Sequence, residues 1–227
     1  MSTKPAAQDQ KDLDIGEVYS RTEHYLEKHK KAVTIGAVAV VAVVAGALGW
    51  KSWVNGKQKE AMDNIWKAQY YFEIDSLDKA IDGDGNYFGF AYIADEYAST
   101  PSGALAHYYL GTCYMKKGEY EPAIEHYKQA DVDDDVLRVM AVGNIGDALV
   151  ELGRADEAVA QFEKAAAMVT SDFTTPMYLM KAGILHQQAG DWKSAGKAFG
   201  RIVREFPLSQ DANQAKKDLG RAEQMAG

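Results

Sequence analysis

The chain has 227 residues, of which 47% are hydrophobic, and its formal net charge is −8. All of this excess negative charge follows residue 50, where 27 acidic residues outnumber 19 basic ones. Nucleic-acid binding depends on clustered lysine and arginine, so we expect no nucleic-acid partner. The single cysteine, Cys113, excludes an internal disulfide framework and a multi-cysteine metal site.

Residues 1–31 are expected to form a cytoplasmic tail. The first dozen residues are polar, which predicts disorder. From Ile15 to Leu26, apolar residues recur every third or fourth position, which predicts a short amphipathic helix.

The next segment is an uncharged apolar run that covers residues 32–50. As a helix it would be about 28 Å long, close to the roughly 30 Å of a bilayer's hydrocarbon core. Lys30 and Lys31 precede the run, and Trp50 and Trp53 follow it, as basic and aromatic residues do at membrane interfaces. This pattern predicts a transmembrane signal-anchor helix over residues 32–53 that contacts the lipid bilayer. A buried core helix is the alternative interpretation.

Basic residues flank both ends of this helix, so their distribution favours neither orientation strongly. The prediction of its orientation depends instead on the short segment before the helix and the whole domain after it. We expect a single-pass protein of the bacterial inner membrane, with the N-terminus in the cytoplasm and the remaining domain in the periplasm. Small residues lie four apart in the run, at Ala42 and Gly46 and at Ala45 and Gly49. That spacing fits close helix packing in lipid, and it equally fits a weakly hydrophobic helix without a packing partner.

Residues 57–103 are expected to hold a degenerate pair of helices with an insertion between them. Apolar residues of 57–72 form one helical stripe, and a second helix is predicted from about residue 86 to residue 98. The insertion contains Asp82-Gly-Asp84-Gly-Asn86, which is similar to the start of a calcium loop. A calcium loop also requires glycine at its sixth position and glutamate at its twelfth, where this chain has Tyr87 and Ile93. The insertion is therefore interpreted as a polar turn.

Residues 104–208 contain one pattern three times, at a period of about 35 residues. In each copy a glycine is followed seven residues later by a second glycine, then by an alanine, and four residues after that by an aromatic residue. A proline closes the third copy. The landmarks are Gly111, Gly118, Ala123 and Tyr127, then Gly146, Gly153, Ala158 and Phe162, then Gly183, Gly190, Ala195, Phe199 and Pro207.

This arrangement resembles the tetratricopeptide repeat, in which each unit of about 34 residues is a pair of antiparallel helices. The first glycine would let two helices approach closely, and the second would turn the chain between them. We expect three such repeats over 104–208 and a polar capping helix over 209–227 that starts at Ser209. The expected fold class is all-α, with one transmembrane helix followed by a tetratricopeptide-repeat superhelix and its capping helix.

The first helix of each repeat is expected to line a concave face where a partner would bind. Its outward positions are mostly apolar, and a methionine-rich surface adapts to varied apolar segments. The alternative is that a tightly wound superhelix covers these side chains. The candidate partner-binding residues are Leu105, Tyr108, Met115, Met140, Val150, Met177, Met180 and Ile184.

The sequence contains no combination of residues typical of an active site. Metalloprotease, nucleophile-elbow and phosphate-loop motifs are missing, and His107, His126 and His186 fall on different predicted helices. We therefore expect a non-enzymatic interaction protein that needs no cofactor and no metal.

The order of these parts resembles the YfgM-like family, the ancillary subunits of the SecYEG protein-export translocon, in the version common in Bacteroidota. The likeness is closest over residues 15–75, especially in the exit from the apolar run, Gly49-Trp50-Lys51-x-Trp53, and extends to AQYYFEIDSLDKAIDGDGNYFGF and FTTPMYLMKAG. It implies an inner-membrane protein with periplasmic repeats. The implied partners are the SecYEG translocon, a membrane-anchored periplasmic chaperone of the prolyl-isomerase type, and unfolded or exported polypeptides. The alternative is a scaffold subunit of another cell-envelope secretion or outer-membrane assembly complex.

Overall fold

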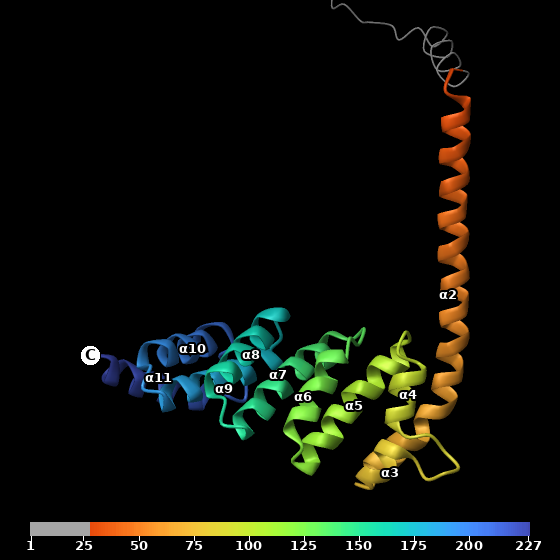
Figure 1. Cartoon of the computed structure of the whole chain (residues 1–227). Coiled ribbons are helices and arrows are strands. Elements are labelled where there is room, and N and C mark those ends of the chain that lie inside the picture. The colour runs from red at the N-terminus through yellow and green to blue at the C-terminus, as the bar shows by residue number, and fades with distance from the viewer. Residues whose placement is uncertain (1–27) are drawn as a thin grey trace, which may run out of the picture. The chain divides into compact units, whose positions relative to one another are not determined.

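The computed structural model describes residues 28–227, which are helical with short connections (Figure 1). They belong to two compact units, Met1–Trp53 and Val54–Gly227. The described part contains no β-strand, only an isolated bridge between Gly83 and Phe88. The amphipathic helix expected within residues 15–26 lies outside the described residues.

The described part of the N-terminal unit is the beginning of α2 (Lys30–Glu73), which carries the whole apolar run. Every residue from 28 to 53 is exposed, as a buried core helix would not be. By length and composition, α2 is the one helix among the described residues that could cross a membrane. The Trp50 and Trp53 rings lie 5.1 Å apart at the end of this run, and Lys30 and Lys31 lie at its start.

In the C-terminal unit, the end of α2 packs with α3 (Leu77–Asp82), α4 (Phe90–Glu96) and α5 (Pro101–Lys117). Together they bury a first core cluster, whose members all lie between Ala61 and Cys113. The largest of its fully buried side chains are Tyr97, Phe90, Ile93 and Leu110.

This region differs from the sequence-based expectation in two places. A short helix, α3, occupies part of the segment expected to be irregular, and α4 starts at Phe90, several residues later than expected. The delay has a local cause, because the Asp84 carboxylate accepts hydrogen bonds from the backbone N–H groups of Asn86 and Tyr87. These bonds hold a tight turn where the second helix was expected to begin.

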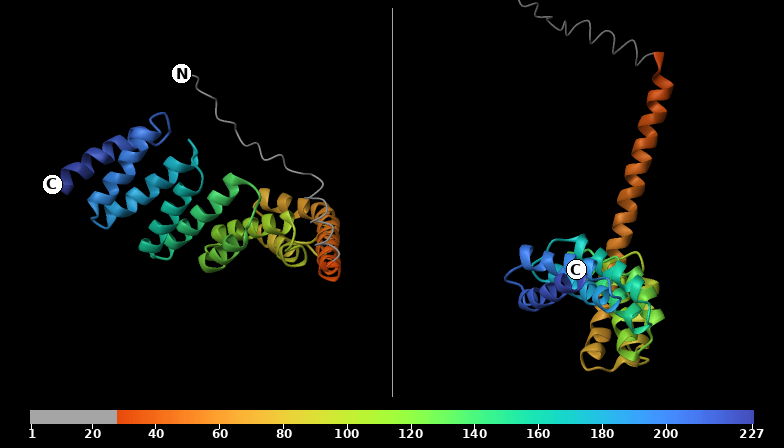
Figure 2. Two further views of the ribbon diagram at one scale, coloured as in Figure 1. Left: turned by 90° about the horizontal axis from the view of Figure 1, so that it is seen from above. Right: turned by 90° about the vertical axis from the view of Figure 1, so that its left-hand side faces the viewer.

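The remaining helices stack side by side in chain order, each against its neighbours in the sequence (Figure 2). They bury a second core cluster, whose members lie between Ala123 and Ala222. Tyr114 packs against both clusters. The helices are α6 (Tyr120–Gln129), α7 (Asp135–Glu151), α8 (Ala155–Met168), α9 (Thr174–Gln188), α10 (Trp192–Glu205) and α11 (Ala212–Ala226).

The three helix pairs α5–α6, α7–α8 and α9–α10 use the same two glycine positions. In the turn inside each pair, Gly118, Gly153 and Gly190 have φ of +76°, +71° and +77°, a left-handed conformation that favours glycine. Earlier in each pair, a glycine faces the ring of the second helix. A Cβ atom there would come within 2.7, 2.6 and 2.5 Å of the ring in the pairs Gly111–Tyr127, Gly146–Phe162 and Gly183–Phe199.

The alanine of each second helix also belongs to the core, since Ala123, Ala158 and Ala195 are fully buried. In the third pair, α10 ends at Glu205 and the exposed Pro207 follows its cap. The same small and aromatic residues therefore shape all three pairs, and a ring fills the space that each glycine leaves.

The final helix starts later than expected. Helix α11 begins at Ala212, not at Ser209, because the Ser209 N–H donates to the Phe206 carbonyl and closes a turn first. One side of α11 is buried through Ala212, Ala215 and Ala222, and most of its other residues are exposed. A helix with one apolar and one polar side closes the end of a repeat array.

Candidate partner-binding face

The surface formed by α5, α7 and α9, the first helices of the three pairs, carries the residues that sequence reasoning selected. Most of them are half-buried, among them Leu105 on the first core and Tyr108, Met115 and Met177 on the second. Met140 is also half-buried. The exposed members are Val150 and Ile184, at 39% and 40% exposure. Met180 is buried in the second core, with 7% exposed, and contributes packing there.

Polar side chains on the same three helices are joined from one pair to the next. Lys181 of α9 donates to both carboxylate oxygens of Asp147 on α7, at 2.6 and 2.7 Å. The Tyr108 hydroxyl of α5 lies close to the Asn144 side chain of α7. Within the first pair, Tyr127 of α6 donates to Thr112 Oγ1 at 3.1 Å. We call Tyr108, Thr112, Asn144, Asp147 and Lys181 the polar strip.

A glycine makes room for the aromatic side chain next to this strip. Tyr178 is 1% exposed, and its ring lies where a side chain at position 143 would otherwise stand. A Cβ atom on Gly143 would come within 2.0 Å of that ring. The Lys181 ammonium lies 5.7 Å from the centre of the Tyr178 ring and 5.4 Å from that of Phe162, so a cation–π contact supports the ion pair with Asp147.

The tyrosines of this region are held in the neutral state. Burial raises the pKa of Tyr127 to about 12, and burial also raises the pKa of Tyr108 and of Tyr178. At physiological pH these hydroxyls are therefore neutral groups that can donate or accept hydrogen bonds. The only formal charges of the strip are those of Asp147 and Lys181, each about one-third exposed.

Of the polar strip, sequence reasoning assigned Tyr108 to the site and left out the other four residues. A usable signal was present, because Asp147 and Lys181 are separated by 34 residues, one repeat period. Side chains one period apart lie on neighbouring first helices in a stacked array, so an acid and a base at that spacing can pair.

Elsewhere in residues 28–227, the cysteine and two of the histidines are fully or partly buried. Cys113 is fully buried, and burial raises the pKa of its thiol to about 12, which keeps it unreactive. His107 and His126 face each other with 3.0 Å between their Nδ1 atoms. Over residues 28–227, no group of three or more histidine, cysteine, aspartate or glutamate side chains could hold a metal ion.

Comparison with known families identifies the repeated unit. Three models, each described as a tetratricopeptide repeat, match residues 104–130, 141–168 and 178–209. A search of curated proteins found no match.

Two solved structures show the same fold. One, described as the crystal structure of MamA protein, has a TM-score of 0.53 and 19% identity over 76% of this chain and 84% of that chain. The other is a Podospora anserina putative kinesin light chain with nearly identical TPR-like repeats, with a TM-score of 0.53 and 15% identity over 75% of this chain and 88% of that chain. Residues 28–227 thus have an all-helical fold that contains three tetratricopeptide repeats, and proteins built from these repeats are generally interaction scaffolds without enzymatic activity.

Proposed function

We propose that this tetratricopeptide-repeat protein is a membrane-anchored, non-enzymatic interaction subunit whose repeats bind polypeptide along the face of α5, α7 and α9. The observation that carries this proposal is the polar strip, which crosses all three repeats beside exposed apolar residues. Lys181 and Asp147 join the third helix pair to the second, and Tyr108 of the first pair lies close to Asn144 of the second.

The chemistry of the strip suits a polypeptide. Each residue of an extended chain offers one N–H donor and one carbonyl acceptor. Asn144 and the neutral Tyr108 hydroxyl can serve either group, while Asp147 accepts and Lys181 donates. Val150 and Ile184 are exposed and would contact apolar side chains of the bound segment. The half-buried Tyr108 ring would add contact area at low entropic cost.

The cellular role follows from the resemblance to the YfgM-like family. On that basis we assign the protein to the inner membrane, with the N-terminus in the cytoplasm and the repeats in the periplasm. Its partners would be the SecYEG translocon and a membrane-anchored periplasmic chaperone, and its clients would be exported polypeptides. The apolar run of α2, exposed along its whole length, supports the membrane anchor.

Affinity purification of the full-length protein from its own membranes in mild detergent, followed by mass spectrometry, tests this proposal. We expect the channel subunits and a periplasmic chaperone to co-purify with the wild-type chain. Lys181→Glu places two carboxylates side by side in the strip and should reduce recovery of the chaperone or client. Lys164→Glu makes the same charge change at an exposed position of α8 and serves as the matched control.

Recovery of a different envelope complex without channel subunits would replace the translocon role by a scaffold role elsewhere. Equal recovery with Lys181→Glu and with the control would remove the polar strip from the binding site. A second variant tests whether residues 32–53 themselves bind the channel. If a generic transmembrane helix in place of residues 32–53 preserves recovery of the channel, the anchor is only a tether.

A further inference from the structure

The C-terminal unit is divided between a strongly acidic part and a basic end. Residues 54–191 carry 11 lysine and arginine residues against 23 aspartate and glutamate residues, a net charge of −12. Residues 192–227, which contain α10 and α11, carry seven basic residues against four acidic ones, a net charge of +3. The sign of the charge therefore reverses at the last helix pair.

The positive charge is concentrated in a row along α10. Lys193, Lys197, Arg201 and Arg204 follow one another at intervals of four, four and three residues, so they share a side of the helix over about 16 Å. Arg201 is paired with Glu205 at 2.9 Å. Among residues 28–227, no salt bridge joins the other three to an acidic side chain, and all three are exposed.

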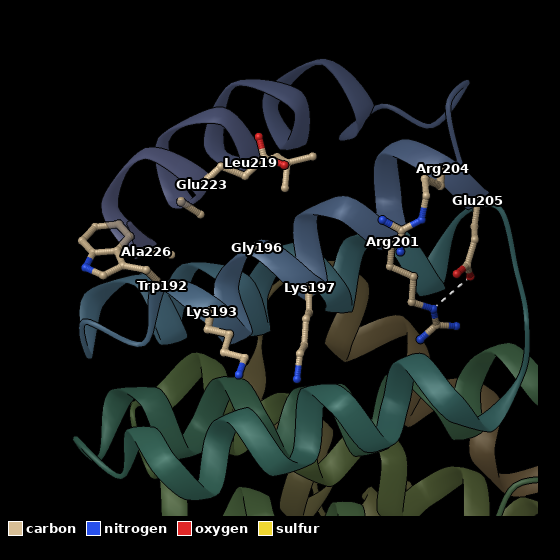
Figure 3. A pocket seen from close by; sticks show the side chains of 11 residues that line it. Trp192, Lys193, Gly196, Lys197, Arg201, Arg204, Glu205, Leu219, Glu223 and Ala226 are labelled. Atoms are coloured by element: carbon tan, nitrogen blue, oxygen red, sulfur yellow. Dashed lines mark hydrogen bonds and ion pairs between the residues drawn. The ribbon is translucent and has the colours of Figure 1, made fainter.

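This row borders a groove of about 540 Å³ between α10 and α11 (Figure 3). The apolar part of the groove comes from Gly196, Leu219 and Ala222. Trp192 closes one end, and the Arg221 guanidinium lies 5.9 Å from the centre of its ring. Figure 3 shows Lys193, Lys197 and Arg201 extending from α10 on the side away from α11, which carries Leu219 and Glu223. The groove therefore has an apolar floor, and the row of cations forms a cationic wall along its α10 edge.

The cationic wall borders a second hollow as well. A space of about 320 Å³ lies on the other side of α10, next to α8 and α9, and Lys197 and Arg201 line both. The two cations thus stand on a ridge between two depressions, where a bound chain could approach them from either side.

We propose that the α10–α11 groove binds an acidic polypeptide segment in an extended conformation. Cations four residues apart on a helix are spaced by about 6 Å, and alternate residues of an extended chain by about 6.6 Å. A segment with an acidic residue at every second position would therefore place successive carboxylates against Lys193, Lys197 and Arg201. The residues between them, if apolar, would face Leu219, Ala222 and Trp192.

The same features argue against a membrane surface or a nucleic acid as the occupant. Glu205 and Glu223 lie on the lining of the groove, where they would repel a continuous layer of phosphates. The site is concave with an apolar floor, which fits side chains better than it fits a flat bilayer. The large negative charge of residues 54–191 opposes long polyanions. This site is separate from the polar strip, and the inference does not rest on the proposed function.

Peptide binding to the full-length protein in neutral phosphatidylcholine nanodiscs tests the inference. The probe is a fluorescein-labelled Asp-Leu-Asp-Leu-Asp-Leu-Asp peptide, and its control has asparagine at every aspartate position. We expect fluorescence anisotropy to show binding of the acidic peptide alone, weakening as salt rises. The double variant Lys193→Glu/Lys197→Glu should weaken binding by roughly tenfold or more.

Two further variants distinguish specific binding in the groove from non-specific attraction between opposite charges. Lys128→Glu/Lys164→Glu makes the same charge change at exposed positions of α6 and α8, and it should bind the peptide as well as the wild type apart from a small long-range effect. Gly196→Met changes no charge and fills the floor. A Cβ atom at Gly196 meets only the Ala222 methyl, at 3.7 Å, so this variant should fold normally and lose binding.

Several outcomes would overturn the inference. Equal binding of the acidic and asparagine peptides, or equal losses in the two double variants, would show that the groove does not recognise an acidic segment. If phosphatidylglycerol vesicles bind through Lys193 and Lys197 and the peptide does not, the groove is a membrane contact. Self-association of the full chain that depends on the same lysines, without peptide binding, would assign the groove to a second copy.

Discussion

The two core clusters of the C-terminal unit are stabilised in different ways. The second cluster repeats one device three times, a glycine on the first helix against a ring on the second. The first cluster uses contacts that occur once. Gln58 exchanges two hydrogen bonds with Ser102, Tyr71 donates to Asp84, and Lys57 pairs with Glu96. The regular repeats are therefore stabilised mainly by the fit of apolar side chains. The region around the first cluster, which we call the irregular unit, is stabilised by specific polar contacts.

This difference suggests that the two regions respond to damage in different ways. A device that is repeated can lose one copy while its neighbours persist, because each repeat contacts mainly the next one. A contact that occurs once has no substitute.

The largest effect is expected from Gly103→Ala, at the start of α5. A Cβ atom there would lie 2.1 Å from the Tyr97 carbonyl oxygen and 2.6 Å from its carbon, and backbone atoms cannot move aside as a side chain can. We expect the free energy of unfolding to fall by ~3 kcal/mol. Thermal unfolding of the full-length protein, followed by circular dichroism, measures this loss.

The matched control for Gly103→Ala is Gly220→Ala in α11, where a Cβ atom would meet nothing within 4 Å. Replacing a helix-interior glycine with alanine at an open position stabilises by about 0.5–1 kcal/mol. The comparison fails if the two substitutions shift the melting temperature in the same direction.

A smaller loss is expected from Gly146→Ala in the regular repeats. Its Cβ atom would come within 2.6 Å of the Phe162 ring, which can shift partly, so we expect a loss of about 1–3 kcal/mol. Adding Phe162→Leu should recover part of this loss, because the smaller side chain vacates the contested space. Strict additivity of the two substitutions in unfolding experiments would contradict the glycine–ring mechanism.

The polar contacts of the irregular unit predict a local effect. Gln58→Ala removes the side chain that donates to Ser102 Oγ and accepts from the Ser102 N–H, each at 3.0 Å. We expect a loss of about 1 kcal/mol and faster hydrogen exchange in peptides covering residues 100–104. Unchanged exchange there, with wild-type stability, would show that the bonds contribute nothing.

The smallest effect is a pH dependence from His107 and His126. Burial lowers the pKa of both imidazoles. The charge of His126 lowers the pKa of His107 further, while Glu125 opposes the shift at His126. The unfolded chain therefore binds protons more readily, so stability should fall as pH drops through the ordinary histidine pKa of about 6.5. The melting temperature between pH 7.5 and pH 5 measures this fall, and His126→Asn should flatten it. A steeper fall in the variant would contradict the assignment.

The sequence was informative wherever the repeat period places a residue. The ring at Phe162 belongs against Gly146 because the same spacing occurs in all three copies, and one repeat explains the others. The stagger between neighbouring repeats was not predictable in the same way. The burial of Met180 and the position of the Tyr178 ring over Gly143 both depend on that stagger.

Structural elements that occur only once could not be predicted from the repeat pattern either. Helix α3 and the turn around Asp84 depend on long-range contacts, such as the 2.6 Å bond from the Tyr71 hydroxyl to the Asp84 carboxylate. That bond lowers the pKa of Asp84 and stabilises its charged form. The spacing of cations on α10 is visible in the sequence, but the groove beside them exists because Gly196 faces the small side chain of Ala222.

Packing of each helix against its neighbours in the sequence has a consequence for how the protein is made. Contacts between adjacent segments close short loops, which favours rapid folding. The first core is complete in the sequence once Cys113 has been added, and Tyr114, the next residue, is the side chain that also reaches the second core. The chain can therefore fold in the order of its synthesis, with each finished helix pair presenting a surface to the pair that follows.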